Sequence, residues 1–103
     1  MTAPASPTAR APHRHITAAT RRDADRRLRS IRGHVEGILR MLEDEQAYCV
    51  DILKQVKAVQ SALDRVGDVV LRSHLQGCVT DAIKHGEGEA AIDEVMEALK
   101  YQR

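Results

Sequence analysis

Two cysteines and one histidine in this 103-residue chain have the residue types and the spacing of a metal site. His74 and Cys78 are four residues apart in a stretch that reads as helix, so both side chains lie on one face and can bind the same ion. Cys49 precedes His74 by 25 residues, which is about 37 Å along a helix that rises about 1.5 Å per residue. One chain cannot close a Cys–His–Cys site along that helix. Two antiparallel copies can, because each gives Cys49 to the other's His74 and Cys78.

The donor set indicates which metal such a site prefers. Two thiolates and one imidazole form a soft site that suits Cu(I), and Zn(II) fits if a fourth ligand joins. A Cys–His pair also serves in nucleophilic catalysis. The sequence has no Gly-rich loop, no oxyanion-hole signature and no mixed α/β pattern that would place a third catalytic group. We therefore expect a metal-binding protein and not an enzyme.

The first element that must position this site is an amphipathic helix. Apolar residues recur at spacings of three and four from Leu28 to Leu42, the pattern of a helix with one apolar face. Thr20 is the expected N-cap, with Asp23 in the first turn. The acidic run 43–45 is expected to end the helix, because negative charge is unfavourable at a helix C-terminus.

A second, longer helix is expected from about Gln46 to the glycine-containing turn at 85–88. A short third helix follows, and no strand alternation or internal repeat is present. The sequence therefore predicts an all-α, three-helix protomer with one long central helix. The apolar residues expected to face inward from the third helix are Ile92, Val95, Met96 and Leu99.

The long central helix cannot be covered by two shorter ones, so part of its apolar seam remains exposed, and exposed seams of this size mark interfaces. We expect an antiparallel dimer about a two-fold axis, which is a four-helix bundle, and leftover apolar faces could extend it to a dimer of dimers. Residues 1–19, which contain all three prolines, are expected to form a disordered tail. Residues 20–103 are expected to form the single domain.

The composition also predicts where the protein is located. No apolar run approaches the roughly 20 residues that span a bilayer, and the N-terminal residues lack the hydrophobic region of a secretory signal. We therefore expect a cytoplasmic protein without a membrane partner, in which the cysteines are thiols.

Charge is strongly segregated along the chain. Residues 10–40 contain nine arginines and only three carboxylates, whereas residues 41–103 contain seven basic and twelve acidic side chains. Segregation of this kind favours a polyanion as partner of the basic part. The alternative interpretation is a solvated helix face that follows a basic tail.

Several segments resemble the copper-sensitive operon repressor family. Residues 27–42 (RLRSIRGHVEGILRML) are similar to its first-helix signature, residues 48–56 (YCVDILKQV) to its metal-ligand segment, and residues 73–78 (SHLQGC) to its second ligand segment. The likeness continues through residues 88–94. It covers about residues 26–101 and is closest to the actinobacterial copper sensors.

The resemblance implies a transcriptional repressor whose three-helix protomers pair into an antiparallel four-helix bundle, usually doubled into a flat tetramer. Such proteins bind operator DNA in the apo state without a helix-turn-helix. Cu(I) bound across the protomer interface releases the DNA and derepresses copper-efflux genes. Carried over by position, the metal ligands are Cys49, His74 and Cys78, the outer-shell residues are Tyr48 and Glu94, and the DNA-binding residues are Arg27 and Arg65.

Alternatives within and outside this family remain open at the level of sequence. Nickel and cobalt sensors of the superfamily add an upstream histidine, which aligns near Ile16, and His15 is adjacent to that position. His13 and His15 are then either an extra nitrogen ligand or plain linker residues. Persulfide sensors have Cys where His74 stands, so they fit less well. Outside the family, a helical metal-storage or redox protein with no DNA role is the second hypothesis.

Overall fold

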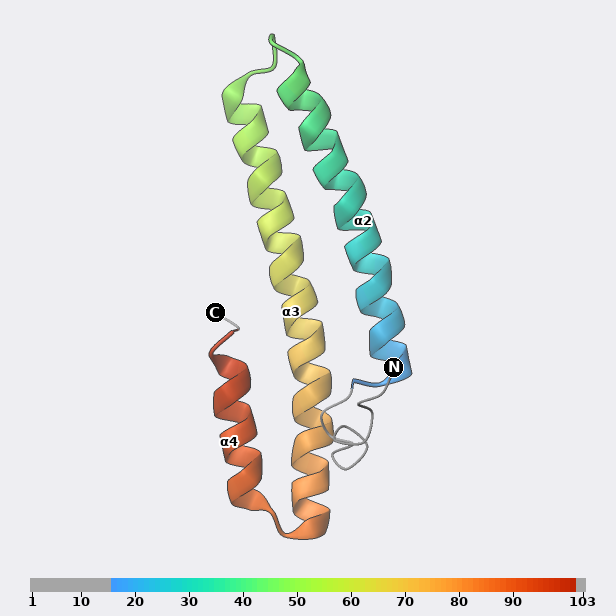
Figure 1. The fold of residues 1–103 in the computed structure, drawn as a ribbon, viewed down its shortest axis with the longest axis vertical. Helices are drawn as coiled ribbons and strands as arrows, with labels where there is room; N and C mark the ends of the chain where they lie inside the picture. Colours follow the sequence, from blue (N-terminus) through green and yellow to red (C-terminus); the bar gives the residue numbers. More distant parts are fainter. Residues whose placement is uncertain (1–15, 102–103) are drawn as a thin grey trace, which may run out of the picture.

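The computed structural model describes residues 16–101, and this part of the chain consists of three helices (Figure 1). Helix α2 spans Ala18–Glu43, α3 spans Cys49–His85 and α4 spans Gly88–Leu99. Helices α2 and α3 form an antiparallel hairpin, and α4 folds back along the C-terminal part of α3, on the side away from α2 (Figure 1). The predicted all-α protomer with a long central helix is confirmed.

Helix α2 begins earlier than predicted. Thr17 is the N-cap, and its hydroxyl oxygen accepts a hydrogen bond of 3.1 Å from the backbone N–H of Thr20. Thr20 therefore lies inside the helix and is not its cap. Residues 18–19 are alanines, which have the highest helix propensity, and they belong to α2. The predicted disordered tail 1–19 is thus too long at its C-terminal end, and residues 1–15 lie outside the described part.

Helix α3 is uninterrupted over 37 residues. It begins at Cys49, after Tyr48 as N-cap, and so three residues later than predicted. The delay has a local cause: Gln46 donates its backbone N–H to the Asp44 carboxylate at 2.9 Å, which holds the connection in a turn. At the other end Gly86 is the C-cap with φ 67°, a left-handed conformation that glycine adopts without steric cost. The predicted glycine turn is confirmed.

The buried core of the hairpin is small. Ala24 and Ile31 from α2 are 8% and 9% exposed, and they pack against Val66 of α3, which is 9% exposed. Nearer the closed end of the hairpin, His34 Nε2 lies 2.6 Å from the amide oxygen of Gln55, which joins the two helices by a polar contact. Three half-buried residues of α3 complete the core: Val59, Ala62 and Val70.

Large apolar side chains remain exposed along both helices of the hairpin, as expected for a long helix that its neighbours cannot cover. In spite of them, no helix of residues 16–101 combines the length and the apolar composition needed to cross a membrane. Patches of this extent on a protein surface mark interfaces. The exposed residues include Leu28, Val35, Leu39, Leu42, Val50, Leu53, Val56 and Leu63.

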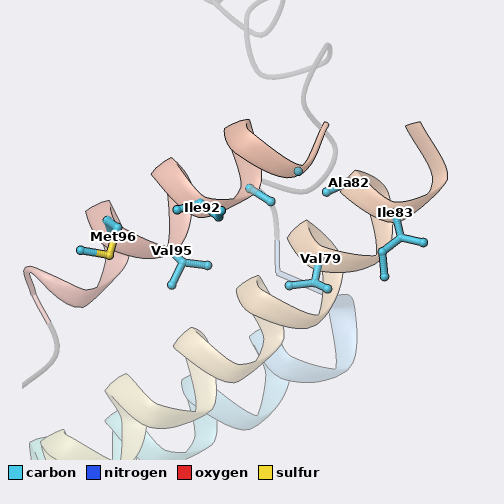
Figure 2. Close-up of a pocket in the computed structure, with 8 residues that line it drawn as sticks. Val79, Ala82, Ile83, Ile92, Val95 and Met96 are labelled. Carbon is cyan, nitrogen blue, oxygen red and sulfur yellow. The ribbon is translucent and has the colours of Figure 1, made fainter. Parts of the chain in front are cut away.

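The prediction that the apolar face of α4 points inward holds for Val95, which is half-buried, but is wrong in the protomer for the other three residues. Ile92 and Met96 are 62% and 60% exposed, and Leu99 is 45% exposed. The reason is that α4 packs only against the C-terminal part of α3 (Figure 1), so that Val79 and Val95 on these facing helices border an open apolar groove (Figure 2), which has a volume of about 360 Å³. A twelve-residue helix with one neighbour cannot bury its whole apolar stripe.

Candidate functional site

Cys49 lies in the first turn of α3, where its side chain is an exposed free thiol. Because α3 continues without a break past His74, the two residues are about 37 Å apart along its axis. Cys49 and His74 are therefore far apart within one chain. This separation agrees with the prediction from the sequence.

His74 makes a specific contact with Glu94, which α4 brings to it. The Nε2 atom of His74 lies 3.2 Å from Oε1 of Glu94, and the two side chains are 17% and 29% exposed. In the neutral ring an N–H at Nε2 donates to the carboxylate, so the lone pair of Nδ1 is available for a metal. Carboxylate partners of this kind orient the ring of a metal-binding histidine and raise its basicity. The contact of His74 with Glu94 has the geometry in which a carboxylate supports a histidine ligand.

Cys78 follows His74 by four residues in α3. This register puts both residues on one helix face, although the side chain of Cys78 lies outside the described part of the structure. His13 and His15 also lie outside it. Within the described residues, no three His, Cys, Asp or Glu side chains come together as a group that could hold a metal ion.

Tyr48, predicted as an outer-shell residue, is the N-cap of α3 and is 63% exposed. It sits next to Cys49, at the end of α3 opposite the part that α4 covers (Figure 1). The protomer therefore keeps Tyr48 apart from the other predicted outer-shell residue, Glu94. Tyr48 lies beside Cys49, and Glu94 lies beside His74.

The surroundings of His74 are apolar on one side. His74 borders a groove of about 380 Å³ between α3 and the C-terminal end of α4. Apolar walls lower the local dielectric constant, which strengthens polar contacts such as the one between His74 and Glu94. The other residues of this groove are Gly67, Val70, Leu71, Ala98 and Tyr101.

The two arginines predicted to bind DNA, Arg27 of α2 and Arg65 of α3, lie together. Both border one hollow of about 410 Å³ on the surface where the two helices meet, and Arg26 and Ser30 also line it. Guanidinium groups are the side chains best suited to bind phosphate groups, so the chemistry of this hollow is compatible with a phosphate-like anion. The family resemblance named Arg27 and Arg65, and the packing of α2 on α3 brings Arg26 and Ser30 to the same hollow.

Asp23 holds two of these arginines. Its carboxylate accepts a hydrogen bond from Nε of Arg27 at 3.1 Å and forms an ion pair with Arg26. The hydrogen bond from Arg27, together with the charges of Arg27 and Arg26, holds the pKa of Asp23 below its usual value, against an opposing effect of burial. The sequence assigned Asp23 only to the helix dipole; its i, i+3 and i, i+4 spacing to the two arginines was the signal for these pairs.

A second polar hollow, of about 350 Å³, adjoins the first and shares Arg65 with it. Asp23 lines it together with Arg72 and Ser73. At its rim, the backbone N–H of Thr17 lies 3.4 Å from the hydroxyl oxygen of Ser73. The start of α2 thus touches the residue that directly precedes His74.

Comparison with known proteins matches the chain to one family. The family model described as metal-sensitive transcriptional repressor matches residues 20–101. The copper-sensing transcriptional repressor CsoR of Mycobacterium tuberculosis (strain ATCC 25618 / H37Rv) is 49% identical over 83 residues, which are 81% of this chain and 69% of that protein. The protein of the same name from Bacillus subtilis (strain 168) is 43% identical over 86 residues, 84% of each chain.

Two solved structures share the fold. The nickel-responsive transcriptional regulator InrS superimposes with a TM-score of 0.75 at 36% identity, over 80% of this chain and 91% of that one. The copper-sensing repressor CsoR with Cu(I) from Geobacillus thermodenitrificans NG80-2 gives a TM-score of 0.70 at 39% identity, over 82% and 86% of the two chains. The fold is therefore shared by a copper sensor and a nickel sensor, and the metal must be argued from the donor atoms.

Proposed function

Because this chain belongs to the family of metal-sensitive transcriptional repressors, we propose that it is a Cu(I)-responsive repressor. In this proposal the apo protein binds operator DNA in the cytoplasm, and Cu(I) releases it, so that copper-efflux genes are transcribed. The observation that carries the proposal is the pairing of His74 with Glu94 at 3.2 Å, with Cys78 about one turn further along α3. This pairing leaves one imidazole nitrogen free beside a cysteine on the same helix face.

The third ligand is Cys49 of a second protomer. Helix α3 separates Cys49 from His74 by about 37 Å within the chain, whereas antiparallel pairing of two α3 helices aligns the end of one with the C-terminal part of the other. The exposed apolar residues of the hairpin support such pairing: Leu39, Leu42 and Leu53 are 53%, 61% and 64% exposed. In a closed two-fold dimer each protomer contributes to both sites, and dimers can pair further into a tetramer.

The donor atoms favour Cu(I) over Ni(II) and Co(II). Two thiolates and one imidazole are soft, and thiolate-rich sites select Cu(I), whereas nickel sites use more nitrogen and oxygen donors in tetragonal geometry. Since a nickel-responsive regulator and a Cu(I)-bound repressor share this fold, the donor atoms and not the fold distinguish the two metals. The pair of cysteines in the present chain supports copper.

DNA is bound through the hollow that Arg26, Arg27 and Arg65 line between α2 and α3, called the arginine hollow below. Arg27 and Arg65 each contact a phosphate of the backbone, which provides affinity that decreases with salt. Contacts of this type set position and affinity more than they read bases. No described element projects as a recognition helix: α2 and α3 lie packed along each other (Figure 1).

The switch operates through Glu94 and Tyr48. With a metal on Nδ1 of His74, the Nε2–H would be a stronger donor to Glu94, which would hold α4 more firmly against α3. In the proposed dimer, Tyr48 of the partner subunit lies near the same histidine, because it directly precedes the partner's Cys49 in the sequence. The DNA is released because the metal-bound protein favours a conformation whose arginines fit the DNA less well, and coupling of this kind is typically about 1–3 kcal/mol.

A mobility-shift titration with operator DNA tests this function. The apo protein should shift the DNA, one Cu(I) per protomer should release it, and Ni(II) or Co(II) at the same concentration should not. Arg27→Ala and Arg65→Ala should each weaken binding and reduce the salt slope by about 0.9 for each phosphate that is no longer neutralised, while Cu(I) still binds. Release by Ni(II) instead would make the protein a nickel sensor, and no shift at all would favour a metal-storage protein.

A further inference from the structure

Asp23 contacts two of the three arginines that line the hollow assigned to DNA by the proposed function. It bonds Nε of Arg27 at 3.1 Å and pairs with Arg26, two residues that border the arginine hollow. It also lines the adjoining hollow beside Arg65 and Arg72. Two guanidinium groups thus contact Asp23 directly, and two more, together with the carboxylate of Asp68, line the same adjoining hollow.

The carboxylate of Asp23 is negatively charged at neutral pH, as aspartates ordinarily are, and its hydrogen bond from Arg27 and the nearby arginine charges lower its pKa further. A carboxylate and a phosphodiester bind guanidinium groups through the same N–H donors and in similar planar geometry. The Nε donor of Arg27 and a terminal nitrogen of Arg26 are already occupied by Asp23 in the free protein. An incoming phosphate must either displace the carboxylate or bind beside a like charge.

We propose that Asp23 sets the affinity of this protein for DNA, because its carboxylate competes with backbone phosphates for Arg26 and Arg27. When a phosphate replaces the Asp23 carboxylate, Arg26 and Ser30 complete the site that binds the phosphate. This inference rests on the proposed DNA-binding function of the Arg27 and Arg65 face. Since phosphates are the same in every sequence, Asp23 weakens binding to operator and to unrelated DNA by the same factor.

The Asp25–Arg29 ion pair is a matched control for the pairing of Asp23 with Arg27. Asp25 accepts a hydrogen bond from Nε of Arg29 at 2.9 Å, with the same i, i+4 spacing in the same helix. Asp25 lines neither of the two hollows. Replacing Asp23 or Asp25 by asparagine therefore removes one negative charge from α2 in each case and disrupts its ion pairing. Only the first substitution frees arginines of the hollow.

The test measures binding of the full-length Asp23→Asn, Asp25→Asn and wild-type proteins to operator duplex and to a random duplex of equal length, across a salt series. Two unit charges about 5 Å apart in water repel by the equivalent of about a fourfold change in affinity. Asp23→Asn should therefore bind both duplexes at least about fourfold more tightly. Its salt slope should steepen by up to about 0.9 for each further phosphate that the freed arginines neutralise. Asp25→Asn should gain clearly less on both duplexes.

Two further variants separate competition from a structural role. Asp23→Gln places a better helix former at this position and should show the same gain in DNA affinity as Asp23→Asn. Asp23→Glu keeps the negative charge and should bind DNA like the wild type. In an Arg27→Ala background the gain from Asp23→Asn should shrink. Unchanged or weaker binding by both neutral variants, or an equal gain from Asp25→Asn, would overturn the proposal. If Arg27→Ala itself has no effect on DNA binding, the proposed DNA face fails and not only the role of Asp23.

Discussion

The prediction with the clearest geometric basis is that the Cys49→Ala and Cys78→Ala variants repair each other when mixed. A metal–sulfur bond is about 2.3 Å long, and α3 runs unbroken from Cys49 through His74, a separation of about 37 Å. In a mixed antiparallel dimer, one interface keeps Cys49 from one chain with His74 and Cys78 from the other. The opposite interface has neither cysteine.

The expected amount of restored site follows from this arithmetic. Random pairing of equal amounts of the two variants makes about half of the dimers mixed, and each mixed dimer has one intact site of two. The mixture should thus bind about a quarter as much Cu(I) with high affinity as the same amount of wild-type protein. The assay is competition with a Cu(I) chelator after co-refolding, and X-ray absorption should report two sulfur ligands and one nitrogen ligand at the restored site.

A control mixture isolates the cross-protomer effect. Cys49→Ala mixed with the Cys49→Ala, Cys78→Ala double variant retains no interface with all three ligands, so it should bind no better than its components. If the mixture of single variants also binds no better than its parents, the ligands come from one chain. Helix α3 would then have to break between Val50 and Ser73, and the dimer site would be refuted.

Three further predictions concern the switch and the fold. Glu94→Gln should still bind Cu(I) but release operator DNA poorly in a mobility shift, because the amide no longer offers His74 a charged acceptor; release equal to the wild type would exclude Glu94 from the switch. Ile31→Ala, at a position 9% exposed, should lower the free energy of unfolding in urea by about 2–4 kcal/mol, and a decrease below about 1 kcal/mol would show that this core contributes little. Gly86→Ala, at φ 67°, should cost about 1–2 kcal/mol in the same assay. Gly88→Ala should cost less, because a Cβ meets nothing within 4 Å at either glycine and only Gly86 has a positive φ; equal costs would contradict the left-handed cap.

The features of the site that depend on neighbours along one helix could be predicted from the sequence. His74 and Cys78 share a face because the helix repeat is local, and the separation of Cys49 follows from the rise per residue. The exposed seam of α3 was predictable too, because its length exceeds that of the helices available to cover it. Helix ends were harder to predict: Thr17 and not Thr20 caps α2, since two threonines three residues apart compete for the same role.

Contacts between helices were decided only by the tertiary structure. The rotation of α4 about its axis brings Glu94 within 3.2 Å of His74, and the packing of α2 on α3 places Arg27 and Arg65 around one hollow. Neither contact follows from periodicity. A helical repeat identifies the apolar face of one helix, but it does not show which face of a second helix packs there or how the two helices are offset along their axes. The sequence by itself determined which atoms can bind metal and which charges can bind DNA. The packing of three helices determined which of them act together, because only packing selects one rotation and one offset for each pair of helices.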